Sequence, residues 1–303
     1  MLLLFLYNKD VFARDKDVTP VFEGNPGPYH VAYPRNYKFI QDQSRICYDH
    51  NPFLVVIVPV APHNQEARDT IRKTWGNDSL VQEKKFLVLF LLGLPSGANT
   101  EKMQEMLSLE NQRHQDLIQA NFTDSYRNLT IKTMMMLEWL ASYCDQALYA
   151  VKVDSDILLN LRNLVKILPK VPKDYMTGLV WWHSVVLRDP SNKFYLPYDV
   201  YQKPEYPPYP LGMCYVISLD LPAKLLKASR QIKPIYIEDA YLGMCLEKLG
   251  VKPTNSPNPT DFVVVPPDNY DRCFYASTIA IMTKSSAELT KFWTDLNRFG
   301  YMC

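Results

Sequence analysis

The stretch Ala147-Leu-Tyr-Ala-Val-Lys-Val-Asp-Ser-Asp156 joins an apolar run to two closely spaced carboxylates. Ala147–Val153 has the length and composition of a strand that is buried in a parallel sheet. Asp154 and Asp156 follow that strand, and an extended backbone would direct both side chains to one side, with their Cα atoms about 6.6 Å apart. Because ligands of open α/β sheets bind at the carboxyl ends of the strands, this stretch predicts a sheet with a binding site at its edge.

The residues before this stretch alternate between strand and helix patterns. Apolar runs predict strands at Phe53–Val60 and Phe86–Leu92. Helices are predicted at about 65–75, 103–119 and 128–144, with Asn64 and Asn128 as N-caps of the first and third. This alternation predicts an α/β fold with a mostly parallel central sheet flanked by helices.

The second half is less regular. Strands are predicted at Tyr175–Val180, Cys214–Leu219 and Phe262–Val265, and helices at Glu238–Leu249 and Ala287–Leu296. The segment Phe194–Pro210 is rich in Tyr and Pro, which argues against a helix or a central strand. Residues 8–50 are polar and aperiodic, and we interpret residues 1–50 as a stem or lead-in before a domain at 51–303.

Composition narrows the class of protein. The 303 residues carry a net charge of +1 and show no basic stripe, which argues against a nucleic-acid partner. The 6 cysteines form no Cys-x-x-Cys pair, so they suit two or three disulfides or buried free thiols rather than zinc. Three glycosylation sequons, at Asn77, Asn121 and Asn128, favour a secretory-pathway glycoprotein.

The apolar run Met1–Leu6 is too short for a membrane anchor. A membrane-spanning helix needs about 20 apolar residues, and a signal peptide also needs a longer apolar core than this one. Either an anchor lies upstream of this chain or the chain has none.

The carboxylate pair suggests a divalent cation. Asp154 and Asp156 offer hard oxygen ligands, which suit a cation that keeps water and phosphate oxygens as its other ligands. Such a cation neutralises a diphosphate and assists its departure. The alternative is an acidic turn that caps a helix beginning near Leu161.

Arg68 and Arg72 lie four residues apart on one face of the first predicted helix. The planar guanidinium fork binds oxyanions through two hydrogen bonds, so the pair could hold phosphate at the same edge of the sheet. The alternative is a solvated basic face that also includes Lys73.

Glu238 and Asp239 open a predicted helix. Acidic residues in a first turn stabilise the helix dipole, which is one reason for their presence. A group-transfer enzyme that acts on an alcohol also needs a general base, and Asp239 is our candidate. Rigid aromatics in loops could stack on sugar rings, and we predict acceptor contacts for Trp181, Trp182 and Tyr209, together with Glu238; the alternative is that the aromatics pack the loop down.

Four blocks resemble those of the β-1,3-galactosyltransferases and β-1,3-N-acetylglucosaminyltransferases of glycosyltransferase family 31, and most closely the former. They occur in the family's order, with similar spacing, over about residues 52–297. The blocks are Glu66-Ala-Arg-Asp-Thr-Ile-Arg-Lys-Thr-Trp-Gly76, Asp124-Ser-Tyr-Arg-Asn-Leu-Thr-Ile-Lys-Thr133, Lys152-Val-Asp-Ser-Asp156 and Ile237-Glu-Asp-Ala-Tyr-Leu-Gly243.

The resemblance implies a GT-A fold, a type II Golgi membrane protein, a UDP-sugar donor, Mn²⁺ and inversion at the anomeric carbon. It implies that Asp154 and Asp156 bind the metal and, with Ser155, the donor. Arg68, Arg72 and Lys152 fall in donor-side motifs. Asp239 would activate the acceptor 3-hydroxyl.

The chain departs from the family pattern at two places. The family commonly has Cys-Ser-Gly-Thr-Gly-Tyr where this chain has Pro210-Leu-Gly-Met-Cys-Tyr215, which keeps only Gly212 and Tyr215. Met282 stands where the family has a histidine that completes the metal site, and a thioether is a poor ligand for Mn²⁺.

Three functions therefore stay open. The first is a β-1,3-galactosyltransferase that moves galactose from UDP-galactose to a GlcNAc- or GalNAc-ended glycan of a glycoprotein or glycolipid. The second is a β-1,3-N-acetylhexosaminyltransferase, which differs in its donor. The third is a catalytically silent relative that binds glycans or a partner enzyme.

Overall fold

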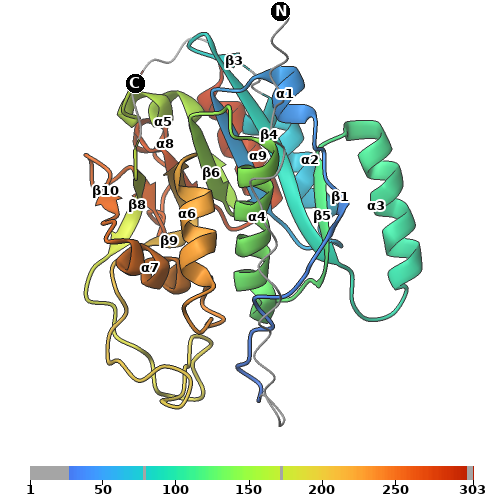
Figure 1. Cartoon of the computed structure of the whole chain (residues 1–303). Helices are drawn as coiled ribbons and strands as arrows, with labels where there is room; N and C mark the ends of the chain where they lie inside the picture. Colours follow the sequence, from blue (N-terminus) through green and yellow to red (C-terminus); the bar gives the residue numbers. More distant parts are fainter. Residues whose placement is uncertain (1–26, 78–79, 171–172, 299–302) are drawn as a thin grey trace, which may run out of the picture.

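A computed structural model describes residues 27–77, 80–170, 173–298 and 303 (Figure 1). Its centre is a nine-stranded sheet in the order β1-β5-β4-β2-β6-β9-β8-β10, with β3 beside β4. These strands are β1 Phe39–Gln41, β2 Leu54–Pro59, β3 Leu80–Val81, β4 Lys84–Leu94, β5 Leu117–Thr123, β6 Tyr149–Val153, β8 Met176–Trp181, β9 Tyr209–Ser218 and β10 Thr254–Asn255. A small second sheet joins β11 Phe262–Val263, β12 Ala280–Met282 and β7 Ile157–Leu159.

The sheet is mostly parallel. Strands β5, β4, β2 and β6 pair in parallel, as do β8 and β10. Strand β9 runs antiparallel to both of its neighbours, β6 and β8. The prediction of an α/β fold with a mostly parallel central sheet flanked by helices is confirmed.

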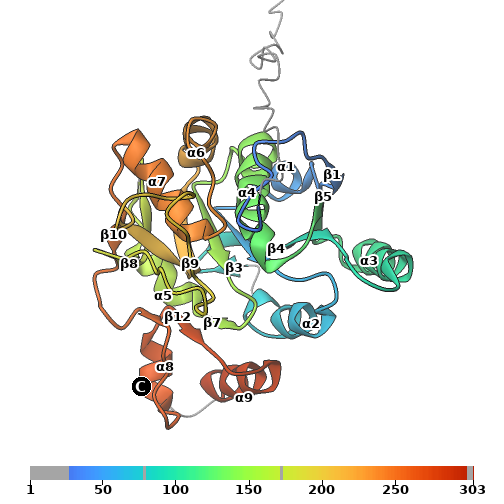
Figure 2. The same cartoon turned by 90° about the horizontal axis from the view of Figure 1, so that it is seen from below.

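Helices cover both faces of the sheet. Figure 2 shows α4 and α6 on one face and α2 and α9 on the other, while α3 lies beside the sheet edge. The helices are α1 Ile46–His50, α2 Gln65–Lys73, α3 Thr100–His114, α4 Leu129–Tyr143, α5 Leu161–Ile167, α6 Leu221–Ser229, α7 Glu238–Leu249, α8 Arg272–Ser277 and α9 Ser286–Leu296. Asn64 caps α2 as predicted, because its side chain accepts a hydrogen bond from the backbone N–H of Ala67 at 3.2 Å.

The core is divided by the sheet into two layers. Along β2, Val55 and Ile57 belong to the cluster that includes α4, α6 and α7. The alternate residues Leu54, Val56 and Val58 belong to the cluster that includes α2 and α9. A strand that is buried on both faces has no polar side, which is why the sequence shows a continuous apolar run here.

The residues before β2 join the folded body. Strand β1 pairs with β5 through Phe39 and Ala120. A disulfide links Cys47 of α1 to Cys144 at the end of α4. The part of the predicted lead-in that the structure describes therefore contributes a strand and a helix to the fold, whereas the Met1–Leu6 run lies outside the described residues.

Two predicted segments were wrong in part. The helix predicted at 103–119 ends at His114, because Gln115 takes a left-handed conformation (φ 53°) and β5 begins at Leu117. The segment predicted to avoid a central strand, Phe194–Pro210, ends inside β9. Pro210 is accommodated there because the β8–β9 register is irregular beside it, which spares the hydrogen bond that proline cannot donate.

The cysteines form two disulfides within the described residues. The second joins Cys273 to Cys303, and the free thiols of Cys214 and Cys245 are buried. In the ranges that the structure describes, no helix has both the length and the apolar character needed to cross a bilayer.

The Cys47–Cys144 disulfide closes a loop of 97 residues and should stabilise the fold. We expect the double substitution Cys47→Ala/Cys144→Ala to lower the free energy of unfolding by about 2–5 kcal/mol. Urea unfolding followed by far-UV circular dichroism measures this change. Cys245→Ala, which removes a buried thiol that forms no disulfide, is the control, and an equal loss in both variants would contradict the prediction.

Candidate functional site

The predicted acidic motif lies at the carboxyl end of β6, in contact with β9. The N–H of Asp154 donates to the carbonyl of Met213 at 2.9 Å, and Val153 pairs with Cys214. The alternative reading, a cap for the helix near Leu161, is wrong. Asn160 caps α5 instead, accepting a hydrogen bond from the N–H of Asn163 at 3.1 Å.

Lys152 is the centre of the site. Its ammonium donates to Asp154 Oδ1 at 2.8 Å and to Glu238 Oε1 at 3.2 Å, and it makes a short contact with the carbonyl of Gly212. The Tyr215 ring centroid lies 5.8 Å from Nζ. The structure thus brings residues from β6, β9 and α7 together around one lysine.

Gly212 connects Lys152 to the candidate base. Its N–H donates to Asp239 Oδ2 at 2.9 Å. A Cβ atom at this position would lie 2.7 Å from Glu238 Oε1 and 3.4 Å from Lys152 Nζ. Glycine is therefore the residue that lets β9 approach the first turn of α7 this closely.

Burial controls the protonation of these groups. It raises the pKa of Glu238 to about 7, and the charges of Asp239 and Asp154 add to this rise while Lys152 opposes it. Burial also raises the pKa of Asp239, against the lowering effect of the hydrogen bond from Gly212. Burial disfavours the charge on Lys152, but Asp154 and Glu238 outweigh it and raise the lysine pKa. The site therefore holds a charged lysine beside two carboxyl groups that take up protons readily.

Asp154 and Asp156 lie in a turn rather than in the extended backbone that we predicted, because the N–H of Ile157 donates to the carbonyl of Asp154 at 3.3 Å. Carboxylate oxygens are ligands that suit a hard divalent cation. Loss of solvent and the neighbouring charge of Asp154 raise the pKa of Asp156, a repulsion that a cation would relieve. Strand β12 places Met282 opposite Ile157, next in sequence to Asp156, and the N–H of Thr283 donates to the Asp156 carbonyl at 2.8 Å. Among the described residues, no group of three His, Cys, Asp or Glu side chains could hold a metal, so protein ligation would rest on the two aspartates.

A cavity of about 360 Å³ lies beside this cluster. It is lined by residues that follow β2 and β4 and by the start of α4, among them His63, Ser96 and Tyr126. Carboxyl ends of adjacent parallel strands meet here, as expected for a ligand site in an α/β sheet. Burial raises the pKa of Tyr126, which lines the cavity, and the charges of Asp239 and Asp154 add to this rise.

Lys132 lines that cavity and was not among the predicted site residues. Its ammonium donates to the carbonyl of Val60 at 3.0 Å and to Asp124 Oδ2 at 2.7 Å. Thr133, the next residue, donates to Glu238 Oε2 at 2.9 Å. A lysine in a helix whose other residues are mostly apolar is rarely buried unless it is paired, and this was the available signal.

Arg68 and Arg72 bind carboxylates of the protein. Both side chains donate to Glu110, Arg68 at 2.6 and 2.7 Å and Arg72 at 2.7 Å. Arg72 also pairs with Asp116 and Asp69 at 2.8 Å. The predicted solvated basic face is wrong, since Arg68 is 1% exposed. In this structure both arginines join α2 to α3 and the start of β5, and their role in donor binding stays a prediction.

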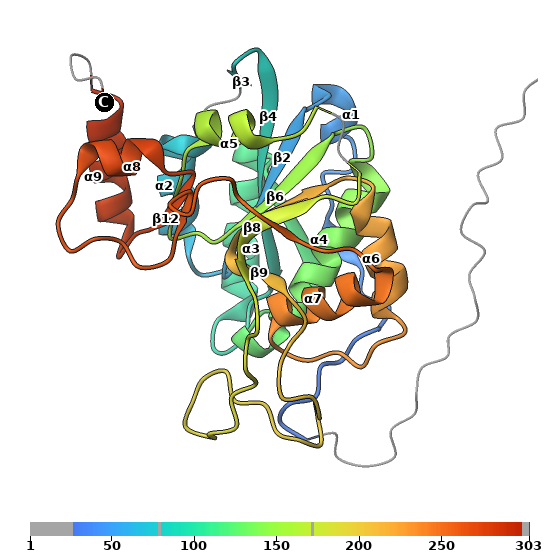
Figure 3. The same ribbon diagram turned by 90° about the vertical axis from the view of Figure 1, so that its left-hand side faces the viewer.

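The predicted aromatic residues lie around the end of β8. Trp181 and Trp182 are about half exposed, whereas Tyr209 is buried and its ring centroid is 6.4 Å from that of Trp181. Tyr209 also stands against Tyr206, which stacks on Tyr201 with centroids 5.2 Å apart. The tryptophans therefore offer ring surface to solvent, while the tyrosines pack the 182–208 segment, which extends below the sheet in Figure 3.

The three sequon asparagines differ in their surroundings. Asn77 and Asn121 are exposed, although Ser79 of the first sequon lies outside the described residues. Asn121 Oδ1 accepts from the N–H of Lys38 at 2.8 Å. Asn128 takes the N-cap position of α4, as predicted, but its side chain makes no capping hydrogen bond and instead donates its amide to the carbonyl of Thr123 at 2.8 Å.

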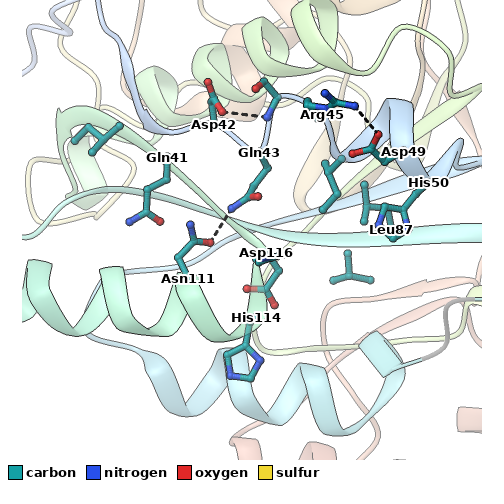
Figure 4. A pocket seen from close by; sticks show the side chains of 15 residues that line it. Gln41, Asp42, Gln43, Arg45, Asp49, His50, Leu87, Asn111, His114 and Asp116 are labelled. Atoms are coloured by element: carbon teal, nitrogen blue, oxygen red, sulfur yellow. Dashed lines mark hydrogen bonds and ion pairs between the residues drawn. The ribbon is translucent and has the colours of Figure 1, made fainter.

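A larger and more open hollow of about 870 Å³ lies near the start of β4, between α1 and the end of α3 (Figure 4). Gln43 donates to Asn111 across it at 2.8 Å, and Arg45 pairs with Asp49 at its rim. No predicted site residue lines it, within the residues that the structure describes. Among the described residues, no predicted site residue lines the smaller cavity either, but Lys132 does, and the adjacent Thr133 binds Glu238, which connects that cavity to the acidic cluster.

Comparison with known proteins identifies the family to which this sheet and site belong. A family model described as galactosyltransferase matches residues 66–257, a range that includes all four motif blocks. The chain belongs to the galactosyltransferase family.

Two relatives show the extent of the likeness. Human beta-1,3-galactosyltransferase 2 is 35% identical over 280 residues, covering 91% of this chain and 64% of that protein. Mouse beta-1,3-galactosyltransferase 1 is 34% identical over 269 residues, covering 87% of this chain and 80% of that protein. The chain thus spans less than two thirds of the first relative's length.

Solved structures resemble the chain only weakly. The galactosyltransferase LgtC, in complex with donor and acceptor sugar analogs, has a TM-score of 0.41 and 11% identity, over 81% of this chain and 97% of that one. A likeness of this size has no bearing on the function of the site.

The Arg68–Glu110–Arg72 cluster should stabilise the fold. We expect Glu110→Gln to lower the free energy of unfolding by roughly 3–5 kcal/mol, because it leaves the buried charge of Arg68 without its partner. Chemical denaturation measures the loss. Glu247→Gln, which breaks an exposed pair with Lys203, should cost below about 1 kcal/mol, and equal losses would contradict the prediction.

Proposed function

We propose that this chain is an inverting β-1,3-galactosyltransferase, a hexosyltransferase that moves galactose from UDP-galactose to the 3-hydroxyl of a GlcNAc- or GalNAc-ended glycan. The observation that carries the proposal is the link from Asp154 through Lys152 and Gly212 to Asp239. It joins a carboxylate suited to the donor side to a partly buried carboxylate suited to proton transfer. Family membership supports the same reaction.

The donor would lie at the carboxyl ends of β2, β4 and β6. The cavity beside Lys132 and Tyr126 would take the nucleoside, and Asp154, Ser155 and Asp156 would face the diphosphate. Mn²⁺ held by Asp154 and Asp156 would supply charge neutralisation for the leaving diphosphate. Residues 51–303 would form the catalytic domain together with β1 and α1, which join the same fold.

Asp239 would act as the general base. Its carboxylate would take the proton of the acceptor 3-hydroxyl while that oxygen forms a bond to the anomeric carbon of galactose. The bond from that carbon to UDP breaks in the same step, so the configuration inverts. A pKa raised by burial gives Asp239 more basicity than an ordinary aspartate has. Trp181 and Trp182 would present ring surface to the acceptor.

The chain would work in the Golgi lumen, as the globular part of a type II membrane glycoprotein. Two disulfides and two exposed sequon asparagines, Asn77 and Asn121, support a secretory-pathway location. Glycoproteins or glycolipids would carry the acceptor glycan.

A second candidate function is a silent glycan-binding relative. Met282 beside Asp156 motivates it, because a thioether does not replace a histidine ligand of Mn²⁺. A screen of UDP-hexoses and UDP-N-acetylhexosamines with GlcNAc and GalNAc acceptors, with UDP release as the readout, separates the candidates. Transfer from UDP-galactose supports the proposal, transfer from a UDP-N-acetylhexosamine alone supports the hexosaminyltransferase, and a folded protein without turnover supports the silent relative.

Asp239→Asn tests the base. We expect turnover to fall by about 10²–10⁴-fold, because an amide cannot accept the hydroxyl proton, while UDP affinity stays close to wild type. UDP release and calorimetry measure the two quantities. Undiminished turnover would exclude Asp239 as the base.

Asp156→Ala tests the donor motif. We expect UDP binding in the presence of Mn²⁺ to weaken by at least about tenfold, since one of two carboxylate ligands is lost. Titration calorimetry with and without Mn²⁺ gives both affinities. Asp295→Ala is the control for a lost carboxylate, because Asp295 binds Tyr270 near α9. Metal-independent binding in the wild type would contradict the prediction.

The pH dependence of kcat/KM should report the raised pKa values of Asp239 and Glu238. Asp239 must be deprotonated to act, and its pKa is raised. As the pH decreases, activity should therefore begin to fall at a pH well above about 3.9, the ordinary pKa of aspartate. Because Glu238 has a pKa of about 7 and is its neighbour, the acidic limb belongs to the pair. A kcat/KM that stays constant down to the ordinary aspartate pKa, in protein that remains folded, would contradict the prediction.

A further inference from the structure

Lys152 has no hydrogen-bonding capacity left for a substrate. An ammonium group has three protons, and Lys152 directs them at Asp154, Gly212 and Glu238. Its side chain is only 6% exposed. In this arrangement Lys152 acts on the donor through Asp154 rather than by direct contact.

The carboxylate of Glu238 also binds groups of the protein. Oε1 accepts from Lys152 and Oε2 accepts from Thr133 at 2.9 Å. The side chain is 8% exposed. Glu238 is thus buried with a protein partner on each oxygen, whereas Asp239 is partly exposed. This difference points to an indirect role for Glu238 in place of the acceptor contact that the sequence predicted.

Gly212 connects Lys152, the partner of Asp154, to Asp239. Its carbonyl contacts Lys152, and its N–H holds Asp239 Oδ2 at 2.9 Å. Because one peptide segment serves both sides and leaves no room for a Cβ, a shift of Lys152 must also move the group that orients Asp239. Asp154 and Asp239 are thus connected through one side chain and one backbone residue.

We infer that Lys152 and Glu238 are positioning residues that couple the donor carboxylate Asp154 to the base Asp239 through the backbone of Gly212. The inference rests on the proposed function and extends it. Glu238 holds the ammonium of Lys152 between itself and Asp154. Without the charge of Glu238, Lys152 would be drawn towards Asp154 and would release its hold on the Gly212 carbonyl.

Glu238→Gln is the deciding variant. Glutamine keeps the shape and an oxygen for Lys152, and the hydroxyl of Thr133 can turn to accept from the new amide. We expect kcat to fall at least about tenfold, because small misplacements of a catalytic group have large effects on rate. The KM for UDP-galactose and the affinity for UDP should stay within about threefold, since no donor contact is removed.

Two further variants make the test specific. Glu247→Gln makes the same change on the same helix at an exposed pair, and kcat should stay at the wild-type value. In the double variant Lys152→Met/Glu238→Gln, the loss in kcat should not exceed that of Lys152→Met by more than about threefold, because Glu238 acts through Lys152. Thermal unfolding of every variant verifies that the protein is folded.

The outcomes separate this inference from the proposed function. A wild type that transfers no sugar would refute the proposed function. A wild type that does so, with wild-type kcat in Glu238→Gln, would refute the coupling alone. A fall in UDP affinity that matches the fall in kcat would also refute it, because Glu238 would then serve donor binding. Fully additive losses in the double variant would show that the two residues act independently.

Discussion

The pairing of β9 with β6 is the constraint on which the site depends. Strand β9 runs antiparallel between two strands of the opposite direction, and its register sets Cys214 opposite Val153 and Tyr215 opposite Lys152. Gly212 consequently arrives at the carboxyl end of β6, where Asp154 leaves the strand. The first turn of α7 packs on the same segment, so Glu238 meets Lys152, 86 residues away in the chain, and Asp239 meets Gly212, 27 residues away.

This pairing concentrates charge in a place that contains little water. Buried carboxylates are costly unless they are paired and hydrogen-bonded, and Lys152, Thr133 and the Gly212 N–H supply the partners. The same burial raises the pKa values of Glu238 and Asp239, which a proton-accepting site requires. A second buried cluster, Arg68 with Glu110 and Arg72, differs in its role, because its charges hold α2 to α3.

Local sequence predicted the elements well where one physical effect dominated. The apolar runs identified β2, β4 and β6, and the predicted helix Glu238–Leu249 is α7. Prediction failed where a distant partner decided the outcome. Residues 117–119, the start of β5, were predicted as helix because the hydrogen bonds that define this strand come from β4 and β1. Pro210 fits a central strand because the register of β8 is irregular beside it.

The sequence by itself determined the fold class, the acidic motif after a buried strand and the candidate base at the start of a helix, because these depend on local patterns and on recognisable motifs. The tertiary structure decided what each charged group binds. It directed Arg68 and Arg72 to protein carboxylates, and it joined Lys152 to Asp154, Gly212 and Glu238. Hydrogen-bond partners far apart in the chain come together only when strands pair and helices pack, so no local pattern contains them.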